Sequence, residues 1–212
     1  MDETLSSNMP GVPAEVQVEL RAVEWADAPA LHRLDYSFET DRIYVLHVYG
    51  NLVQPIEQRI QHGNTALAFE LRETVVDLPL YKDYREFGPT LEAVEARIAS
   101  VDGGYVALAG GEVAGVILLS LEEWRSLTRI EDVIVGRQFR RYGIGSLLLN
   151  CACDWARNRG CWAILLETQN VNYPAIQFYL RNGLEVWGIS QHYYPPGPVE
   201  HEVAVFMGKT LR

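Results

Sequence analysis

Hydrophobic and polar positions along the chain follow two repeat lengths, which predict a mixed α/β domain. Apolar residues that alternate with polar ones, or form short β-branched runs, are typical of strands, whereas a repeat of three or four positions is typical of helices. Strands are predicted at residues 16–20, 43–49, 65–72, 105–109, 113–120, 130–135, 163–168, 184–190 and 202–207. Helices are predicted at residues 27–34, 91–100, 143–159 and 173–181.

The order of these elements predicts one central sheet. The first strands are expected to pair as hairpins, most clearly around Gly110-Gly111, because two glycines accept the backbone twist of a tight turn. The later strands alternate with helices, and a helical crossover between parallel strands passes over the sheet with a right-handed turn. We therefore expect a mixed, mostly antiparallel sheet with helices on both faces. Residues 79–89 are rich in aromatic and turn-forming residues and are expected to form a surface loop.

The chain of 212 residues is the size of one domain, which we place at residues 16–212. Residues 1–15 are acidic and lack the apolar core of a signal peptide, so a disordered lead is expected there. No run approaches the 18 or so apolar residues of a membrane-spanning helix. The sequence therefore predicts a single domain without a membrane partner.

The charge of the chain narrows the class of partner. It has 28 acidic and 18 basic residues, a formal net charge of −10, and 48% hydrophobic residues, enough for a full core. An acidic balance disfavours nucleic acid, which binds basic surfaces. It suits a cationic small molecule instead.

The cysteines and histidines give no sign of a metal site. Cys151, Cys153 and Cys161 are an odd number without ligand spacing, so neither zinc nor disulfides are expected, and a reducing, cytoplasmic setting is. The five histidines, at positions 32, 47, 62, 192 and 201, form no metal-binding pattern.

The stretch from residue 130 to residue 149 predicts a strand, a basic loop and a helix. Glycines such as Gly143 and Gly145 let a backbone approach a ligand, and successive N–H groups then point at one spot. The positive end of the following helix adds to an anion site. Arg137, Arg140 and Arg141 lie in the loop. The alternative is an ordinary turn, since the spacing is neither GxGxxG nor a P-loop.

Two signatures in order make the chain resemble the GNAT superfamily of N-acetyltransferases. Residues 130–149 carry Arg140-x-x-Gly143-x-Gly145, which is similar to the acetyl-CoA pyrophosphate loop of that family. Residues 166–188 carry the second signature, at Asn172, Ala175, Tyr179 and Gly183. The resemblance implies the GNAT fold and acetyl-CoA as co-substrate, without a metal.

Within that superfamily, the chain looks most like the streptothricin acetyltransferases. The likeness includes LDYSFETDRIYVL, LRETVVDLPL, the W-x-x-L-T-x-I-E-D pattern at residues 124–132 and the tail HEVAVFM. It implies acetylation of a β-lysine amine of streptothricin by direct transfer in a ternary complex, which gives antibiotic resistance. The chain lacks an acidic insertion that some relatives carry before the first central hairpin, so the substrate stays open.

The resemblance also assigns cofactor-binding residues. The strand that enters the loop would offer backbone groups to the pantetheine arm, the loop and helix start would hold the diphosphate, and Asn172 would touch the amide arm. The positions are Val133, Ile134, Val135, Arg140, Arg141, Tyr142, Gly143, Ile144, Gly145, Ser146, Asn172, Ala175 and Tyr179.

Three carboxylates are candidates for the general base. An amine like that of lysine has a pKa of about 10.4, so it must lose a proton before it attacks. Glu131 and Asp132 are neighbours on one strand, and alternation predicts that only one faces the substrate. The resemblance favours Glu131, with Asp132 and Glu167 as alternatives. Either member of the pair could instead serve an ion pair with Arg125 or Arg129.

Tyr179 is the candidate general acid. The resemblance places a tyrosine beside the sulfur at this position, and a phenol with a pKa near 10 stays protonated at neutral pH. The alternative is a buried aromatic side chain whose hydroxyl serves only packing.

Acidic and aromatic residues of the less regular segments are candidates for binding the cationic substrate. Carboxylates would bind ammonium groups and aromatic rings would supply apolar or cation–π walls. The candidates are Asp35, Tyr36, Phe38, Glu39, Asp41, Tyr81 and Tyr84. Ordinary loop packing is the alternative.

Other functions stay open at this point. The enzyme alternatives are a polyamine or a protein N-terminal acetyltransferase. The contrasting class is an acyl-CoA-binding sensor module, which would need neither Glu131 nor Tyr179. The sequence does not fix the oligomeric state, and a homodimer is one option.

Overall fold

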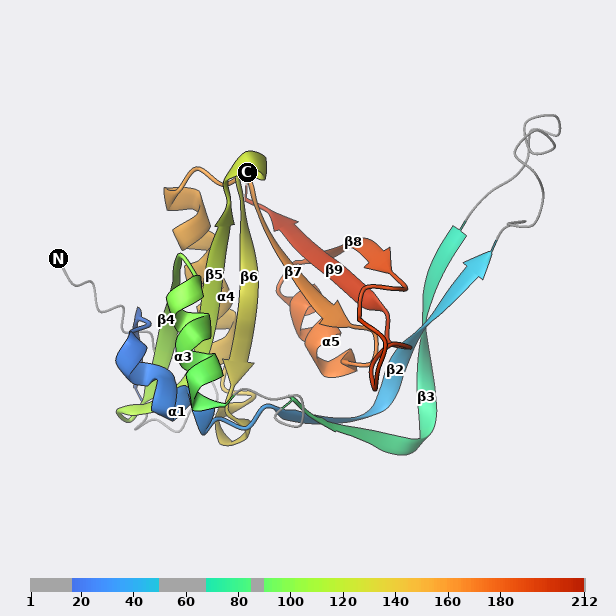
Figure 1. The fold of residues 1–212 in the computed structure, drawn as a ribbon, viewed down its shortest axis with the longest axis horizontal. Coiled ribbons are helices and arrows are strands. Elements are labelled where there is room, and N and C mark those ends of the chain that lie inside the picture. Colours follow the sequence, from blue (N-terminus) through green and yellow to red (C-terminus); the bar gives the residue numbers. More distant parts are fainter. Residues whose placement is uncertain (1–16, 50–67, 85–89, 212) are drawn as a thin grey trace.

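The computed structural model describes residues 17–49, 68–84 and 90–211. Within them, seven strands form a sheet of order β1-β4-β5-β6-β7-β9-β8, and β2 and β3 form a separate sheet (Figure 1). The predicted lead at residues 1–15 lies outside the described residues. The strands are β1 (Val18–Ala22), β2 (Ser37–Tyr49), β3 (Ala68–Asp83), β4 (Gly103–Ala109), β5 (Glu112–Glu122), β6 (Leu127–Val135), β7 (Ala163–Gln169), β8 (Glu185–Ser190) and β9 (Ala204–Thr210). The helices are α1 (Ala28–His32), α3 (Leu91–Ser100), α4 (Ile144–Asn158) and α5 (Tyr173–Arg181).

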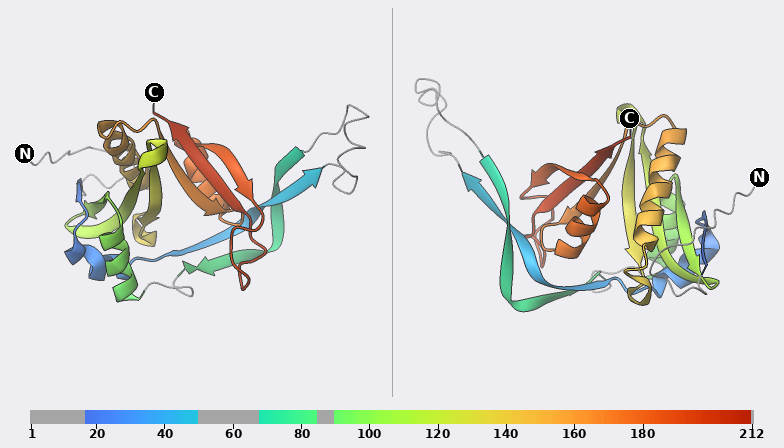
Figure 2. Two further views of the ribbon diagram at one scale, coloured as in Figure 1. Left: turned by 45° about the horizontal axis from the view of Figure 1, so that its top comes forward. Right: turned by 180° about the vertical axis from the view of Figure 1, so that it is seen from behind.

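Helices cover both faces of the larger sheet, as the sequence predicts (Figure 2). Buried side chains of α1 and α3, such as Leu31 and Val94, pack with Val116 on one face. Buried side chains of α4 and α5, such as Leu148 and Ile176, pack on the other face. The apolar stripe of each amphipathic helix thus finds a partner in the sheet.

Strand pairing confirms a mixed, mostly antiparallel sheet. Only β6 and β7 run parallel, among the strands of the larger sheet that the structure describes. The predicted hairpin joins β4 to β5, and Gly110 and Gly111 adopt φ angles of 59° and 83°. Positive φ at both central positions is what a type I′ turn requires, which is why two glycines stand there.

Strands β6 and β7 separate after a short parallel contact. They pair at three positions, from Leu127 with Ala163 to Arg129 with Leu165. Beyond Arg129, β6 continues to Val135 with no strand paired along that edge in the described part of the chain. The second half of β6 therefore offers main-chain groups at an open edge, to which an extended ligand can bind.

A β-bulge interrupts β6 where the two strands separate. Leu118 of β5 lies opposite Asp132, but the next residue, Leu119, lies opposite Ile130. Glu131 is therefore the extra residue, and such an insertion re-aims the side chains around it.

Strands β2 and β3 form a long antiparallel arm that extends past α5 (Figures 1 and 2). The expected hairpin between residues 43–49 and 65–72 is confirmed for its described residues. The predicted surface loop at residues 79–89 is wrong for residues 79–83, which belong to β3. The alternation of aromatic and acidic residues at 36–41 is typical of a strand. The residues of β2 in this range pair with the end of β3, where the loop was expected.

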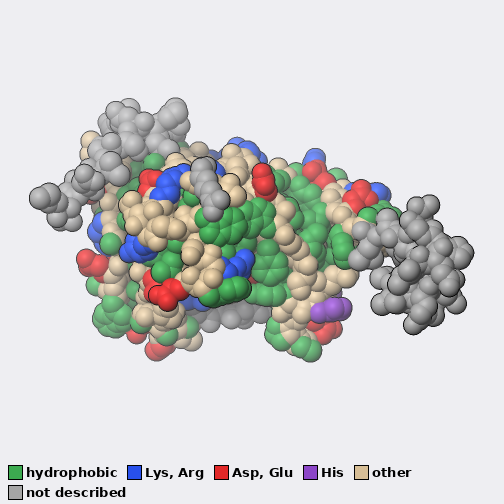
Figure 3. Space-filling model, turned by 90° about the horizontal axis from the view of Figure 1, so that it is seen from above, with side chains coloured by type: hydrophobic (Ala, Val, Ile, Leu, Met, Phe, Trp, Pro, Cys, Tyr) green, Lys and Arg blue, Asp and Glu red, His purple; other side chains and the backbone are tan. Residues whose placement is uncertain are grey.

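On the face drawn in Figure 3, acidic and basic side chains are interspersed among hydrophobic ones. No helix in the described ranges is long and apolar enough to cross a membrane.

Candidate active site

The start of α4 combines an unusual backbone conformation with main-chain amides that lack an acceptor in the described part of the chain. Arg141 and Gly143 adopt φ angles of 72° and 79°, and Gly143 caps the helix without a side-chain hydrogen bond. Among the described residues, no group accepts a hydrogen bond from the amides of residues 141–146, although Leu147 donates to the Gly143 carbonyl. Converging free amides at a helix N-terminus fit a phosphate or diphosphate.

Arg140 fixes this loop through its side chain. Its guanidinium donates to the carbonyl oxygens of Val135 (2.9 Å), Ser37 (2.7 Å) and Asp35 (2.9 Å), and burial lowers its pKa. The side chain therefore joins the loop to the start of the arm. Its predicted contact with the cofactor stays a prediction. Arg141 is exposed at the loop surface.

Gly145 lies where α4 meets α5. A Cβ atom at this position would lie 2.9 Å from Cζ of Phe178, which is closer than a normal contact. The predicted close approach of a cofactor is untested, but the close approach of a helix is visible. A glycine at position 145 therefore lets α4 and α5 pack closely together.

Replacement of Gly145 by alanine is therefore expected to separate these helices slightly. Because the end of the Phe178 ring can shift, we expect a loss of about 1 kcal/mol in unfolding free energy, together with weaker acetyl-CoA binding. Urea unfolding and calorimetry would measure both. Asn150→Ala, on the exposed side of α4, is the control, and an equal effect there would contradict the packing account.

The first turn of α5 holds Asn172 in two contacts. Its Oδ1 accepts from the Ala175 amide at 3.3 Å and caps the helix. Its Nδ2 donates to the Tyr84 hydroxyl at 3.2 Å, and that hydroxyl donates to Gln169 Oε1. Asn172 thereby joins the start of α5 to the residue after β3, at the end of the arm.

Tyr179, on α5, lies in the hydrophobic core between the larger sheet and the helices α4 and α5. Its side chain is buried at 7% exposure, and no described group makes a hydrogen bond with its hydroxyl. Burial raises its pKa, and the negative charges of Asp132 and Glu167 add to the shift. The phenol is therefore protonated at neutral pH and has a proton to give.

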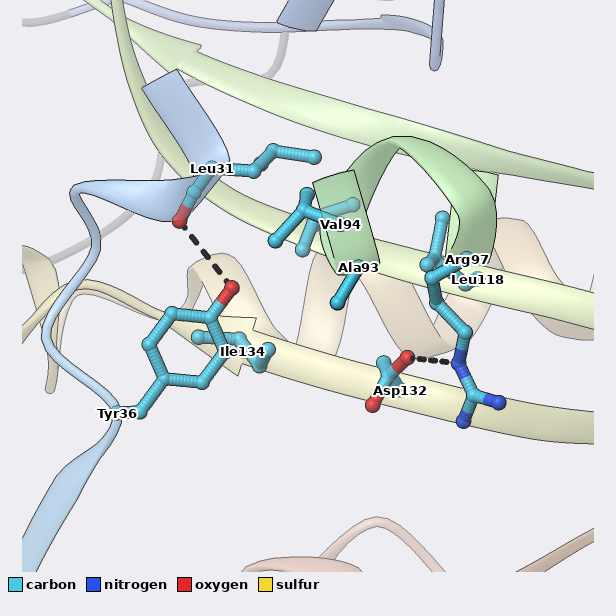
Figure 4. Close-up of a pocket in the computed structure, with 9 residues that line it drawn as sticks. Leu31, Tyr36, Ala93, Val94, Arg97, Leu118, Asp132 and Ile134 are labelled. Atoms are coloured by element: carbon cyan, nitrogen blue, oxygen red, sulfur yellow. Dashed lines mark hydrogen bonds and ion pairs between the residues drawn. The ribbon is translucent and has the colours of Figure 1, made fainter. Parts of the chain in front are cut away.

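Glu131 and Asp132 both turn to the same cation, Arg97 of α3. Arg97 Nε lies 2.8 Å from Asp132 Oδ2 (Figure 4). The Nη2 atom of Arg97 lies 3.5 Å from Glu131 Oε2. The expectation that these neighbours face opposite ways is wrong, because Glu131 is the bulge residue. Burial raises the pKa of Asp132, while Arg97 acts in the opposite direction.

The ion pairs foreseen for these two carboxylates are partly present. Arg129 Nε lies 3.8 Å from Glu131, whereas Arg125 pairs with Glu122 at 3.1 Å.

Glu167, the third candidate base, accepts a hydrogen bond from the Tyr194 hydroxyl. Burial raises its pKa, and this hydrogen bond opposes the shift. A buried ion pair between Lys82 and Glu202, at 2.6 Å, joins the arm to the loop before β9 nearby. The carboxyl of Glu167, a residue of β7, is thus held by Tyr194, on the far side of the gap that opens where β6 and β7 separate.

Four of the seven candidate substrate residues are buried or half-buried. Tyr36 donates to the Leu31 carbonyl at 3.1 Å, and Phe38 packs against Tyr84 with ring centroids 6.0 Å apart. The Asp35 carboxylate accepts from the main chain and hydroxyl of Ser37, so it shapes the turn before β2.

The other three lie on the exposed surface of the arm. Glu39 and Tyr81 face each other across the strands, and Asp41 is exposed. Their part in binding is untested.

Comparison with known proteins identifies the family of the chain. A model of the Acetyltransferase (GNAT) family matches residues 71–184. The chain is 33% identical over 191 residues to a streptothricin acetyltransferase from Streptomyces lavendulae, covering 89% of this chain and 93% of that protein. The chain belongs to the GNAT family of acetyltransferases.

Solved structures give the same GNAT fold. A nourseothricin acetyltransferase superposes with a TM-score of 0.73 at 28% identity, over 92% of this chain and 99% of that one. A candidate streptothricin acetyltransferase from Bacillus anthracis str. Ames, in complex with acetyl coenzyme A, gives 0.69 at 25% identity over 91% and 98%. GNAT enzymes use acetyl-CoA, and this chain is an N-acetyltransferase.

Several residues around the candidate site of this GNAT chain are not identified by the sequence analysis. Arg97 is one arginine on an amphipathic helix, and nothing local marks its carboxylate partners. Tyr194 stands before a proline-rich turn and has no motif. Lys82 and Glu202 form a pair across 120 positions of the chain. Among the described residues, no group of three or more potential metal ligands is present.

Proposed function

We propose that this enzyme acetylates an amine of a cationic small molecule, the β-lysine amine of streptothricin, by direct transfer from acetyl-CoA in a ternary complex. The likeness to streptothricin acetyltransferases over most of the chain supports this substrate. The carboxylates around the end of the β6–β7 contact support a cationic acceptor. Acetylation would remove a positive charge from the antibiotic, and resistance would follow.

One observation carries the proposal. The buried Tyr179 hydroxyl has the charges of Asp132 and Glu167 near it, and Tyr84, close by, accepts a hydrogen bond from Asn172 at the start of α5. A protonated acid and carboxylates that favour a proton are what acyl transfer to an ammonium group needs. The amides of residues 141–146, which have no hydrogen-bond acceptor among the described residues, would hold the diphosphate of the cofactor.

When bound, acetyl-CoA supplies the acetyl group as a thioester. In the proposed reaction, a carboxylate of the chain takes one proton from the substrate ammonium. The freed nitrogen forms a bond to the acetyl carbon as the carbon–sulfur bond breaks. Tyr179 gives its proton to the departing sulfur, and the nitrogen loses a second proton to a carboxylate or to solvent.

We assign the base role to Asp132. Burial raises its pKa toward the range in which a base works well, and it lines a cavity. Both carboxylates pair with Arg97, but Glu131 also lies 3.8 Å from Arg129. The resemblance favours Glu131, and Glu167 also has a raised pKa, so separate substitutions are needed to rank the three.

A thiol-release assay tests the proposed function. We expect acetyl-CoA and streptothricin to release coenzyme A faster than acetyl-CoA with spermidine or with a peptide that has a free N-terminus. Turnover with spermidine alone would move the assignment to polyamines, and turnover with the peptide alone would move it to protein N-termini. Acetyl-CoA binding without any turnover would contradict the proposal. Growth of a sensitive bacterium that expresses the chain, with streptothricin present, tests the resistance.

A further inference from the structure

A cavity of about 210 Å³ lies between β6, α3 and α1, and Asp132, the residue after the bulge, lines it. Most of its lining is apolar, and Asp132 and Arg97 are its charged residues (Figure 4). Tyr36 is on its wall, with its hydroxyl bonded to the Leu31 carbonyl. An apolar pocket with a carboxylate is suited to an aminoalkyl chain, whose stem is apolar and whose head is an ammonium group.

The carboxylate that lines this cavity, where a substrate ammonium group would bind, is already paired with a cation of the protein. The Arg97 guanidinium lies 2.8 Å from Asp132 Oδ2 and 3.5 Å from Glu131 Oε2, and it also donates to the Glu131 carbonyl at 3.3 Å. An incoming ammonium group needs the same carboxylate oxygens. Because Arg97 already lies against Asp132 Oδ2, its positive charge repels a second cation at that carboxylate.

Arg97 is not needed to attach α3 to the sheet. Val94 and Ile98, at 7% and 9% exposure, already bury the apolar face of the helix. The Arg97 side chain itself is 45% exposed, so its guanidinium can turn further into solvent, where water hydrates it. An ion pair of this exposure contributes little to stability, so another cation can replace it.

We propose that Arg97 is a resident substitute for the substrate ammonium, and that a cationic acceptor binds by displacing it from Asp132. The inference rests on the proposed function. The carboxylate is neutralised before and after the exchange, so the empty enzyme avoids an unpaired, half-buried charge. A neutral molecule cannot make the exchange, because it would leave Asp132 without a cation. Arg97 thereby determines specificity for cationic acceptors.

Removal of the competing cation gives the first test. Arg97→Gln is expected to lower KM for streptothricin about twofold to fivefold, the range that an exposed ion pair implies. KM for acetyl-CoA should not change. Arg97→Lys keeps the cation and should return KM for streptothricin toward the wild-type value. The control is Arg157→Gln, which removes an exposed pair with Asp154 (2.8 Å) on α4 and should leave both constants unchanged.

A binding experiment separates this inference from the proposed function. Calorimetry would measure 1,5-diaminopentane binding to the acetyl-CoA-loaded wild type and Arg97→Gln proteins. Tighter binding to the variant supports the displacement even if streptothricin is not turned over. Equal or weaker binding, or binding to neither protein, overturns it. An unchanged or higher KM for streptothricin in a folded variant also overturns it, while the proposed function stands.

Discussion

Replacement of Tyr179 by phenylalanine is expected to lower kcat about 10²- to 10³-fold, the contribution of a positioned general acid. Phenylalanine keeps the ring and loses only the hydroxyl. That hydroxyl has no hydrogen-bond partner among the described residues, so its removal should leave the fold unharmed. The affinity for acetyl-CoA should also persist, because the proposed diphosphate site is the loop before α4. Steady-state kinetics, calorimetry and thermal unfolding would be measured on one preparation.

Tyr173→Phe is the matched control for this experiment. Tyr173 lies on the same helix, but its hydroxyl donates to Glu73 at the exposed surface of the arm, at 3.1 Å. Its loss should change kcat less than about twofold, as expected for a surface substitution away from the site. If Tyr179→Phe kept the wild-type kcat, the acid would have to be another group, and Tyr84 beside it would be the next candidate.

The parts of this site that depend on local sequence are predictable. The loop and the start of α4 follow from glycine positions and an apolar repeat, both read within about 20 residues of chain. The same holds for α5, whose cap Asn172 is the first residue of its signature. The element order also predicts the mixed sheet with helices on both faces, which the structure confirms.

The parts that depend on distant pairing are not predictable in this way. The bulge at Glu131 arises from the register between β5 and β6, which neither strand specifies alone. Arg97 reaches Asp132 across 35 positions, and Arg140 reaches the Ser37 carbonyl across 103. A regular strand would send Glu131 and Asp132 to opposite faces, so the sequence alone gives the wrong geometry for the residues that matter most.

Replacement of Asp132 by asparagine is expected to lower kcat about 10²- to 10³-fold if this carboxylate is the base. Asparagine has nearly the same shape but cannot take a proton from the substrate ammonium. Because the Arg97 pair is partly exposed, the unfolding free energy should change by no more than about 1 kcal/mol. Asp154→Asn, which breaks an exposed aspartate–arginine pair on α4, is the control and should leave kcat unchanged.

The pH profile decides whether the lost group is the base. A base must be deprotonated, so activity should fall as the pH drops through the pKa of Asp132. Burial raises that pKa, and the fall should therefore begin at a higher pH than for an ordinary aspartate. In Asp132→Asn this limb should disappear from the residual rate. If Glu131→Gln or Glu167→Gln abolished the limb and Asp132→Asn kept it, the base role would pass to that residue, and Asp132 would serve only to bind the ammonium group.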